Sequence, residues 1–186
     1  MVEEEDGLVL PAAALAEAKA LLRAADAGED ALIAELLESA ALLCERFTGQ
    51  ALLARGFRET IGGAATDWRR SRGWHRLGRS PVRAITLVEA IDGGGAAVAL
   101  APADYAIDLD SNGDGWVRPA APAARLRVRF EAGMAAEWPV LPAPLRHGIL
   151  RLAAHLYTFR TDAGAVAEPP AAVTALWRPY RRLRLG

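Results

Sequence analysis

Residues 30–49 read DALIAELLESAALLCERFTG, and this stretch has the clearest helical period in the chain. Its apolar residues recur every three or four positions, at Ile33, Leu36/Leu37, Ala40, Leu43/Cys44 and Phe47. That spacing places them on one stripe of a helix. Asp30 is a suitable N-cap, and Gly49 is a suitable left-handed C-cap. The pattern therefore predicts a helix over residues 30–48 that buries one face in a core.

Two further helices are predicted on either side of this one. Pro11 suits a first helical turn, so a helix is expected over residues 11–25. A third is expected over residues 143–160, where the apolar face is spaced by four and three residues: Leu145, Ile149, Leu152, Leu156 and Phe159. The three helices together predict a helical core.

The middle of the chain has a different pattern. Short apolar runs separated by turn residues predict strands at residues 57–61, 82–91, 98–100, 105–109, 115–118 and 126–130, with a long loop over 62–80. In the last strand, Leu126, Val128 and Phe130 alternate with charged residues, as in a half-exposed strand. Short strands joined by turns favour an antiparallel sheet.

The predicted fold is α+β: a helical core with an inserted small antiparallel β subdomain and an extended C-terminal docking tail. Residues 1–9 are expected to be a disordered acidic lead. Residues 10–160 are expected to form a single domain in which residues 55–132 are the β insertion. Residues 161–186 are expected to be a linker followed by the docking tail.

Charge is distributed unevenly along the chain. The net charge is −1, which is not the balance of a general nucleic-acid binder. Residues 1–45 carry eleven acidic residues against Lys19 and Arg23, a net of −9, whereas residues 46–186 carry twelve acidic residues and twenty arginines, a net of +8. Two interpretations stay open: acidic and basic sides that pack head-to-tail between subunits, or two independent solvated faces.

Cys44 is the only cysteine, so the chain has no intramolecular disulfide and no cysteine zinc cluster. Its place in the apolar stripe of a helix predicts a buried, inert thiol. No apolar run approaches the ~20 residues needed to span a membrane, and the acidic N-terminus does not resemble a signal peptide. The protein is therefore expected to be cytoplasmic when made, with no membrane partner.

The segment LWRPYRRLRL, residues 176–185, follows a proline-rich break and mixes cations with apolar side chains. Its arginines are too costly to bury, whereas its aromatic and leucine residues are too apolar for a purely solvated tail. A docking peptide fits both properties. The predicted contact residues are Trp177, Arg178, Tyr180, Arg181, Arg182, Leu183 and Arg184. Deletion of residues 171–186 is expected to leave a folded protein.

Residues 68–79 also mix arginine with tryptophan. The candidate contact residues are Trp68, Arg69, Arg70, Trp74 and Arg76. Tryptophan and arginine dominate protein interfaces, and the same composition can bind single-stranded nucleic acid. A subunit or partner contact, a nucleic-acid contact and a surface loop with no special role all stay open.

Two motifs suggest metal sites only weakly. Residues 108–115 resemble half of a calcium loop, but position twelve is Pro119 instead of the required glutamate, so a hairpin turn is favoured. His147, Arg151 and His155 share one helical face, where a polar surface or subunit contact is favoured over metal. No phosphate-binding glycine motif, nucleophile elbow or carboxylate pair stands out. No metal, cofactor or enzymatic activity is predicted.

Several short motifs occur in the order found in one known family. They are Leu15–Arg23, Glu29-Asp30, Cys44–Gly49, Ser80-Pro81-Val82, Asp104-Tyr105, Gly133, then Pro142, Leu145, Ile149, Leu150, Ala153, Ala154, Tyr157 and Arg160, and finally Leu176, Pro179, Tyr180 and Arg181. On these residues the chain resembles the head–tail connector, or adaptor, proteins of tailed phages and of phage-derived gene transfer agents. The arginine-rich stretch at 68–79 departs from the family pattern.

The resemblance implies a structural protein that forms a ring, typically of about twelve subunits, beneath the portal of a capsid. It further implies that the C-terminal tail binds the portal protein and that the opposite face receives a stopper-like neck or tail protein. DNA would pass through the ring without sequence specificity. The location would be cytoplasmic during assembly and then the particle neck. Three rivals stay open: a small nucleic-acid-binding protein using residues 68–79 and the basic tail, a different neck or tail-completion protein, and an enzyme.

Overall fold

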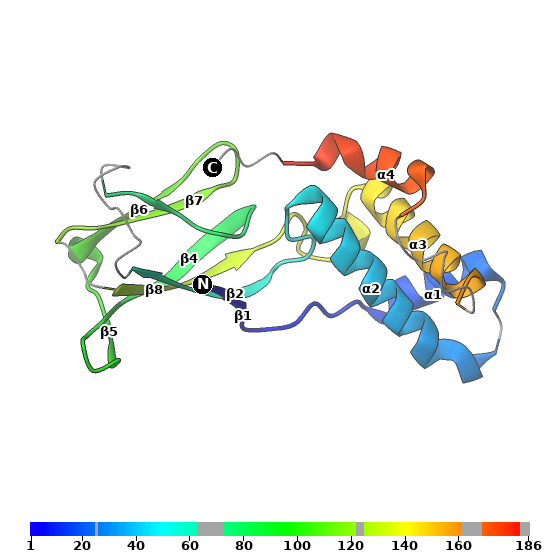
Figure 1. Ribbon diagram of the computed structural model, residues 1–186, viewed down its shortest axis with the longest axis horizontal. Coiled ribbons are helices and arrows are strands. Elements are labelled where there is room, and N and C mark those ends of the chain that lie inside the picture. The colour runs from blue at the N-terminus through cyan, green and yellow to red at the C-terminus, as the bar shows by residue number, and fades with distance from the viewer. Residues whose placement is uncertain (25, 63–72, 122–124, 161–168, 183–186) are drawn as a thin grey trace. The chain divides into compact units, whose positions relative to one another are not determined.

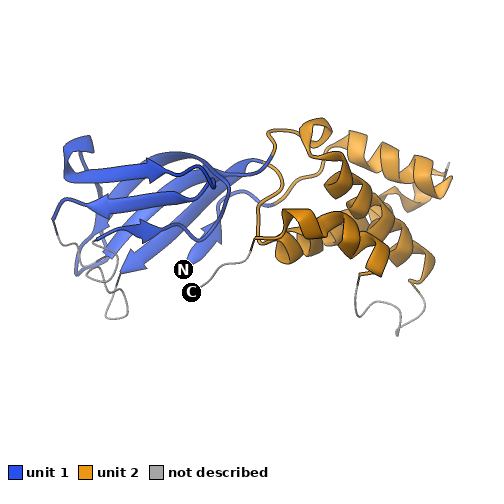
Figure 2. Cartoon of the chain, turned by 90° about the horizontal axis from the view of Figure 1, so that it is seen from above, with its two compact units in different colours: residues 1–7, 54–134 blue, residues 8–53, 135–186 orange. Residues whose placement is uncertain are grey.

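A computed structural model describes the chain except residues 25, 63–72, 122–124, 161–168 and 183–186. The chain divides into two compact units (Figure 2). The first, here called the β unit, consists of residues 1–7 and 54–134. The second, the helical unit, consists of residues 8–53 and 135–186. Each unit is therefore assembled from two separate stretches of sequence. A single domain over residues 10–160 was predicted from the sequence.

The helical unit contains helices α1 (Ala12–Leu22), α2 (Asp30–Thr48), α3 (Ala143–Thr158) and α4 (Ala171–Trp177), with the short 3₁₀ turns η1 (Ala27–Glu29), η3 (Trp138–Val140) and η4 (Arg178–Tyr180). Helix α2 has the predicted bounds, and Gly49 caps it with a φ of 71°. Helix α1 ends earlier than predicted because Arg23 adopts a left-handed conformation, with a φ of 55°. All three predicted helices are present.

The helices bury their apolar stripes against one another. Helix α2 packs on α3, α1 contacts both, and α4 packs chiefly on α3 (Figure 1). Ile33 of α2 and Ile149 of α3 are among the fully buried side chains. The indole of Trp138 is 1% exposed, and its Nε1 donates to Glu17 Oε1 of α1 at 3.2 Å. This core is the one that the period of residues 30–48 predicted.

The β unit contains two antiparallel sheets. The five-stranded sheet has the order β1 (Val2–Glu4), β2 (Arg55–Gly62), β8 (Arg125–Ala132), β4 (Val82–Ile91) and β5 (Ala97–Ala99). The three-stranded sheet has the order β3 (His75–Arg76), β7 (Gly115–Pro119) and β6 (Tyr105–Leu109). All six predicted strands occur, and β4 and β6 have the predicted bounds. The α+β class predicted from the sequence is confirmed.

Strand β8 lies at the centre of the larger sheet, and its alternating pattern sets the core of the β unit. Leu126, Val128 and Phe130 are buried on one face. Phe130 stands opposite Phe57 of β2 in the ladder, and their rings stack with centroids 5.7 Å apart. The intervening residues Arg125, Arg127, Arg129 and Glu131 point to the other face, where the arginines of β8 gather.

Two predictions for this unit need correction. Residues 1–9 were expected to be disordered, but Val2–Glu4 form strand β1 and pair with β2, Val2 opposite Glu59. The β unit is therefore not a simple insertion, because its first strand comes from the N-terminal segment. The predicted loop 62–80 includes strand β3, which pairs with β7. Both strands are very short, and their pairing depends on partners distant in sequence.

No helix in the described part of the chain has the length and apolar character needed to cross a membrane.

Candidate partner-binding surfaces

The C-terminal segment begins with a helix that belongs to the core of its own unit. Trp177 is 0% exposed, and its ring lies 5.8 Å from that of Phe47. Its Nε1 donates to the Leu145 carbonyl of α3 at 3.4 Å. Gly148 makes this fit possible, since a Cβ there would lie 2.2 Å from the indole nitrogen. Trp177 therefore fills a site that α2 and α3 provide.

The prediction that Trp177 is an exposed anchor for a partner is therefore wrong. The local sequence has the proline break and the arginines of a tail, but it does not show the space that Gly148 leaves on α3. The expected tolerance of a 171–186 deletion stays a prediction, and the structure argues against it for the same reason. That deletion removes Val173 and Trp177, which are 2% and 0% exposed, from the helical core.

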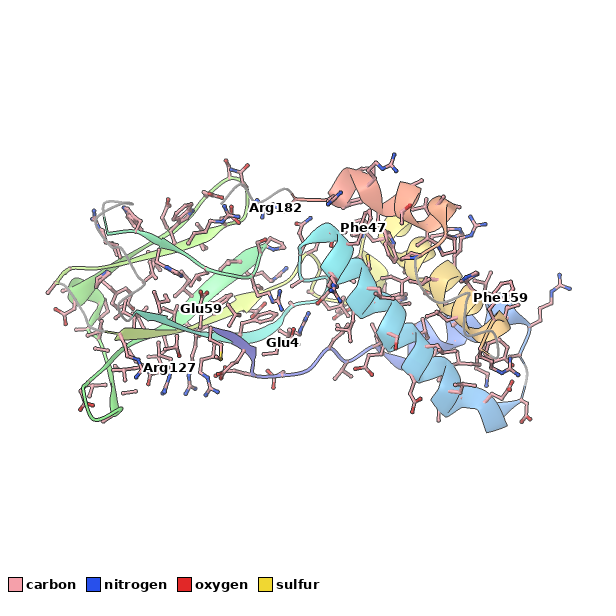
Figure 3. All side chains as sticks on the ribbon, viewed as in Figure 1. Glu4, Phe47, Glu59, Arg127, Phe159 and Arg182 are labelled. Atoms are coloured by element: carbon pink, nitrogen blue, oxygen red, sulfur yellow. The ribbon has the colours of Figure 1, made fainter. Side chains whose placement is uncertain are left out.

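The residues after α4 run along the C-terminal end of α2. The Tyr180 carbonyl accepts from Gln50 Nε2 at 2.5 Å, and the Arg182 amide donates to the Thr48 carbonyl at 2.8 Å. The guanidinium of Arg181 lies 5.7 Å from the centroid of the Phe47 ring. Figure 3 shows Phe47 and Arg182 in this region of the helical unit.

Some of the predicted contact residues still have accessible side chains. Arg178 and Arg181 are exposed, and Tyr180 is half-buried. Leu183 and Arg184 lie outside the described residues. Of the predicted contact residues that the structure describes, Arg178 and Arg181 therefore have the most accessible side chains.

The arginine- and tryptophan-rich stretch is described only from Gly73 onward, so Trp68, Arg69 and Arg70 lie outside the described residues. The Trp74 ring lies under the Arg118 guanidinium, 4.8 Å from ring centroid to Cζ. Arg76 Nε lies 3.4 Å from Asp114 Oδ2. Both side chains therefore help to hold β3 on β7 within the β unit. Trp74 and Arg76 belong to the β unit, whereas the C-terminal segment belongs to the helical unit.

The segment that resembles a calcium loop is a hairpin turn between β6 and β7. The Asp110 carboxylate accepts from the amides of Asn112 and Asp114 at 2.8 and 2.9 Å and from Trp116 Nε1 at 3.1 Å. Gly113 takes the left-handed conformation that the turn requires, with a φ of 76°. Across the described residues, no three His, Cys, Asp or Glu side chains are grouped as metal ligands would be.

A charged face on the five-stranded sheet was not identified from the sequence. Arg58, Arg127 and Arg129 project from β2 and β8 on the face opposite to Glu59, as Figure 3 shows for Arg127 and Glu59. Arg129 Nε lies 3.5 Å from Glu5 Oε1, and Arg127 Nη1 lies 4.0 Å from Glu89 Oε2. The alternation of arginines at 125, 127 and 129 was visible in the sequence, but their acidic partners were not, because they come from the N-terminal segment and from β4.

Ion pairs within each unit join acidic residues from the first part of the chain to arginines from the later part. In the β unit, N-terminal carboxylates pair with later arginines: Glu3 with Arg58 at 2.6 Å, and Glu4 with Arg55 at 3.1 Å. In the helical unit, Glu17 pairs with Arg146 at 3.5 Å, and Glu29 with Arg160 at 3.8 Å. The acidic first part of the chain is thus partly neutralised inside each unit, an outcome that neither interpretation of the sequence included.

Two of these contacts also alter acidities. The hydrogen bond and negative charge of Glu3 raise the pKa of the Arg58 guanidinium above its ordinary value. The hydrogen bond to Glu29, with the carboxylate's charge, raises the pKa of the Tyr157 hydroxyl. In the helical core, burial raises the pKa of the Cys44 thiol, so the group stays protonated and inert at neutral pH.

Comparison with known proteins gives a whole-chain match among solved structures. No protein-family model matches the sequence, and no curated protein matches it. One solved structure, the neck of an empty gene transfer agent particle computed with C6 symmetry, contains a chain that gives a TM-score of 0.77 at 26% sequence identity. The alignment covers 100% of this chain and 97% of that one.

Two more structures give the same result. The virion of a native gene transfer agent particle gives a TM-score of 0.76, and the neck of a native particle computed with C12 symmetry gives 0.74, each at 26% identity with 100% and 97% coverage. This chain has the fold of a gene transfer agent neck protein. The predicted resemblance is confirmed, and a structural role in a particle is supported.

Proposed function

We propose that this chain is an adaptor subunit that forms a ring in the neck of a phage-like particle. The ring joins the portal of the capsid to the tail, and DNA passes through its centre without sequence-specific contacts. The work is mechanical, and no chemical step is assigned to any residue. The protein is made in the cytoplasm and ends in the neck of a phage or a gene transfer agent.

The whole-chain match to neck structures is the observation that carries this proposal. Both units align, since the comparison covers 100% of this chain. Two of the matched necks were computed with sixfold and twelvefold symmetry. Cyclic symmetry of that order requires each subunit to present two different faces to its neighbours. We therefore propose a closed ring of twelve copies.

The portal contact is proposed for the end of the helical unit. Arg178 and Arg181 are exposed there, and residues 183–186 continue the basic, leucine-containing sequence. Arginine suits such a contact because its planar guanidinium forms bidentate bonds with carboxylates. A stopper-like neck or tail protein is proposed to bind the opposite end of the ring.

A small tag can test the location of the protein. In the turn between β4 and β5, a Cβ added at Gly93 or Gly95 would have no other atom within 4 Å, so a peptide inserted there meets open space. Electron microscopy of particles assembled with the tagged chain should show added density in a ring between capsid and tail, repeated twelve times. A tagged protein that folds and yet is absent from particles would overturn the proposal. Binding of nucleic acid with a steep salt dependence would then favour the nucleic-acid rival.

A truncation after Arg182 can test the portal contact separately. It removes Leu183 and Arg184, two of the predicted contacts, and leaves Trp177 in the core. A second variant, Arg178→Glu with Arg181→Glu, reverses the exposed charges. We expect both variants to melt as the unaltered chain does and to bind the purified portal ring more weakly. Arg83→Glu, on the β unit, is the matched control. Normal portal binding by both variants would exclude this segment as the portal contact.

A further inference from the structure

The helical unit has an apolar groove with an acidic rim. Its volume is about 310 Å³, and it lies between α2 and the segment that leads into α1. Leu8, Val9 and Leu37 line it, and Val9 is 79% exposed. Glu35 and Glu38 stand at its edge and are exposed. Among the described residues, neither carboxylate forms an ion pair. The groove therefore has exposed apolar surface beside two available negative charges.

A second groove, of about 350 Å³, lies between α3 and α4 and has the opposite charge. Its lining includes Arg151, His155 and Phe159 at α3 and Val173 of α4. Phe159 is 41% exposed, and its ring lies 4.7 Å from that of His155. Arg151 is exposed and has no acidic partner among the described residues. Figure 3 shows Phe159 at the C-terminal end of α3.

The two grooves lie on different sides of the helical unit. Helices α1 and α4 flank the α2–α3 pair, with α4 along one side and α1 along the other (Figure 1). One copy can therefore present its acidic groove to a neighbour while it presents its basic groove to the next. A contact between two different surfaces of this kind forms a ring when its repeated rotation closes, and an open filament when it does not.

We propose that the acidic groove is occupied by the α3–α4 surface of a second copy of this chain, with Arg151 facing Glu35 and Glu38 and Phe159 against the apolar floor. The charges of the two surfaces are complementary, and the surfaces lie on different sides of the unit, as a contact between neighbouring copies requires. A partly exposed aromatic ring that enters an apolar pocket is the usual anchor of an interface. The charged rim sets orientation and excludes wrong partners. This inference rests on the proposed ring and names the surfaces that build it.

Paired cysteines can test the contact in assembled rings. Glu38→Cys and Arg151→Cys place thiols on the two surfaces, while Cys44 is 0% exposed and unreactive. After treatment with a short bismaleimide, the double variant should give a ladder of covalent multimers. Each single variant should stay monomeric on a denaturing gel, since the proposed contact joins different residues. A covalent dimer from a single variant would indicate a twofold contact and overturn the proposal, as would no ladder from a double variant that forms rings.

Charge reversal gives a second, independent measurement. Glu38→Arg and Arg151→Glu should each weaken the affinity between neighbouring subunits about tenfold, so that rings form only at higher protein concentration. The two changes together should restore much of that affinity. Ser39→Arg, at the next exposed position of α2, is the matched control and should have little effect. If each single reversal left ring formation unchanged, or if the double variant formed rings less well than either single one, this interface would be overturned while the proposed ring would stand. An unaltered chain that forms no ring, alone or in particles, would instead overturn the proposed function as well.

Discussion

The two units of this chain use different side chains in their interiors. The helical unit buries aliphatic and aromatic residues, with Ile33, Leu37 and Trp177 at 1% exposure or less. The β unit buries charges as well: Arg55, Glu59 and Asp114 are exposed by only 8%, 6% and 6%. Every buried charged residue among those described lies in the β unit. The helical core depends mainly on apolar burial, whereas the β unit also depends on satisfied polar pairs.

Glu59 illustrates the difference. One of its oxygens accepts from the Gly78 amide at 2.7 Å, and the other lies 3.1 Å from His75 Nε2. A buried carboxylate is costly unless its oxygens are bonded, so these contacts make its position tolerable. They connect β2 with β3 and with the residues that follow it. In this unit, polar contacts help to hold the segments around the larger sheet in place.

The largest effect is expected from placing a charge in the helical core. Ile33→Asp puts an unpaired carboxylate at a site that is 1% exposed, which should cost about 5 kcal/mol and unfold the helical unit. Far-UV circular dichroism during urea unfolding measures the change. Ser39→Asp, on the exposed face of α2, should behave like the unaltered chain. A normal midpoint for Ile33→Asp would mean that the stripe is an interface and not a core.

A smaller loss is expected from Trp177→Ala. The change removes a fully buried indole and should destabilise the helical unit by about 3–4 kcal/mol. Reaction of Cys44 with a thiol reagent reports opening of this unit, because the thiol is buried within it. The rate should rise strongly for Trp177→Ala and little for Leu42→Ala, whose side chain is 43% exposed. Equal rates for the two variants would mean that Trp177 is not part of the core and would favour its predicted role as a partner contact.

Glu59→Leu is expected to cost about 1–3 kcal/mol, because it removes the acceptor for the Gly78 amide and the partner of His75. The loss should be confined to the β unit. Hydrogen exchange read by mass spectrometry should show faster exchange in β2 and β8 and unchanged exchange in α2. Glu131→Leu, at a partly exposed position, is the control. Uniformly faster exchange in both units would show that they unfold together, so that the comparison between them would not describe separate stabilities.

The smallest effect is expected from a solvent-exposed pair in the same unit. Arg83 Nε lies 3.0 Å from Glu131 Oε1, and the two side chains are 41% and 45% exposed. Arg83→Ala should cost about 0.5 kcal/mol or less at low salt, and the difference should vanish in about 1 M salt. Urea unfolding at both salt concentrations checks this. A loss as large as that of Glu59→Leu would mean that burial does not decide which charges matter here.

The same contrast explains what sequence analysis could predict. Helix α2 and strand β8 were predicted correctly because their apolar periods are local and complete within each element. Strand β1 was missed because Val2–Glu4 is short and acidic, and its pairing depends on β2, more than fifty residues later. Trp177 was misplaced because its pocket is made by Gly148 on another helix. The exposure of Arg178 and Arg181 followed from their charge, which needs no tertiary information.

The origin of strand β1 limits how this protein can change over evolution. A domain encoded by one continuous stretch of sequence, whose two ends lie close together in space, can be acquired, lost or exchanged between genomes in one event. The β unit does not meet that condition, since it draws on residues 1–7 as well as 54–134. Removing 54–134 alone would leave β1 without the strand it pairs with, and transplanting 54–134 alone would leave the edge of β2 unpaired. We therefore expect the two units to be inherited together. A relative that lacks the β unit should also differ in the segment before α1.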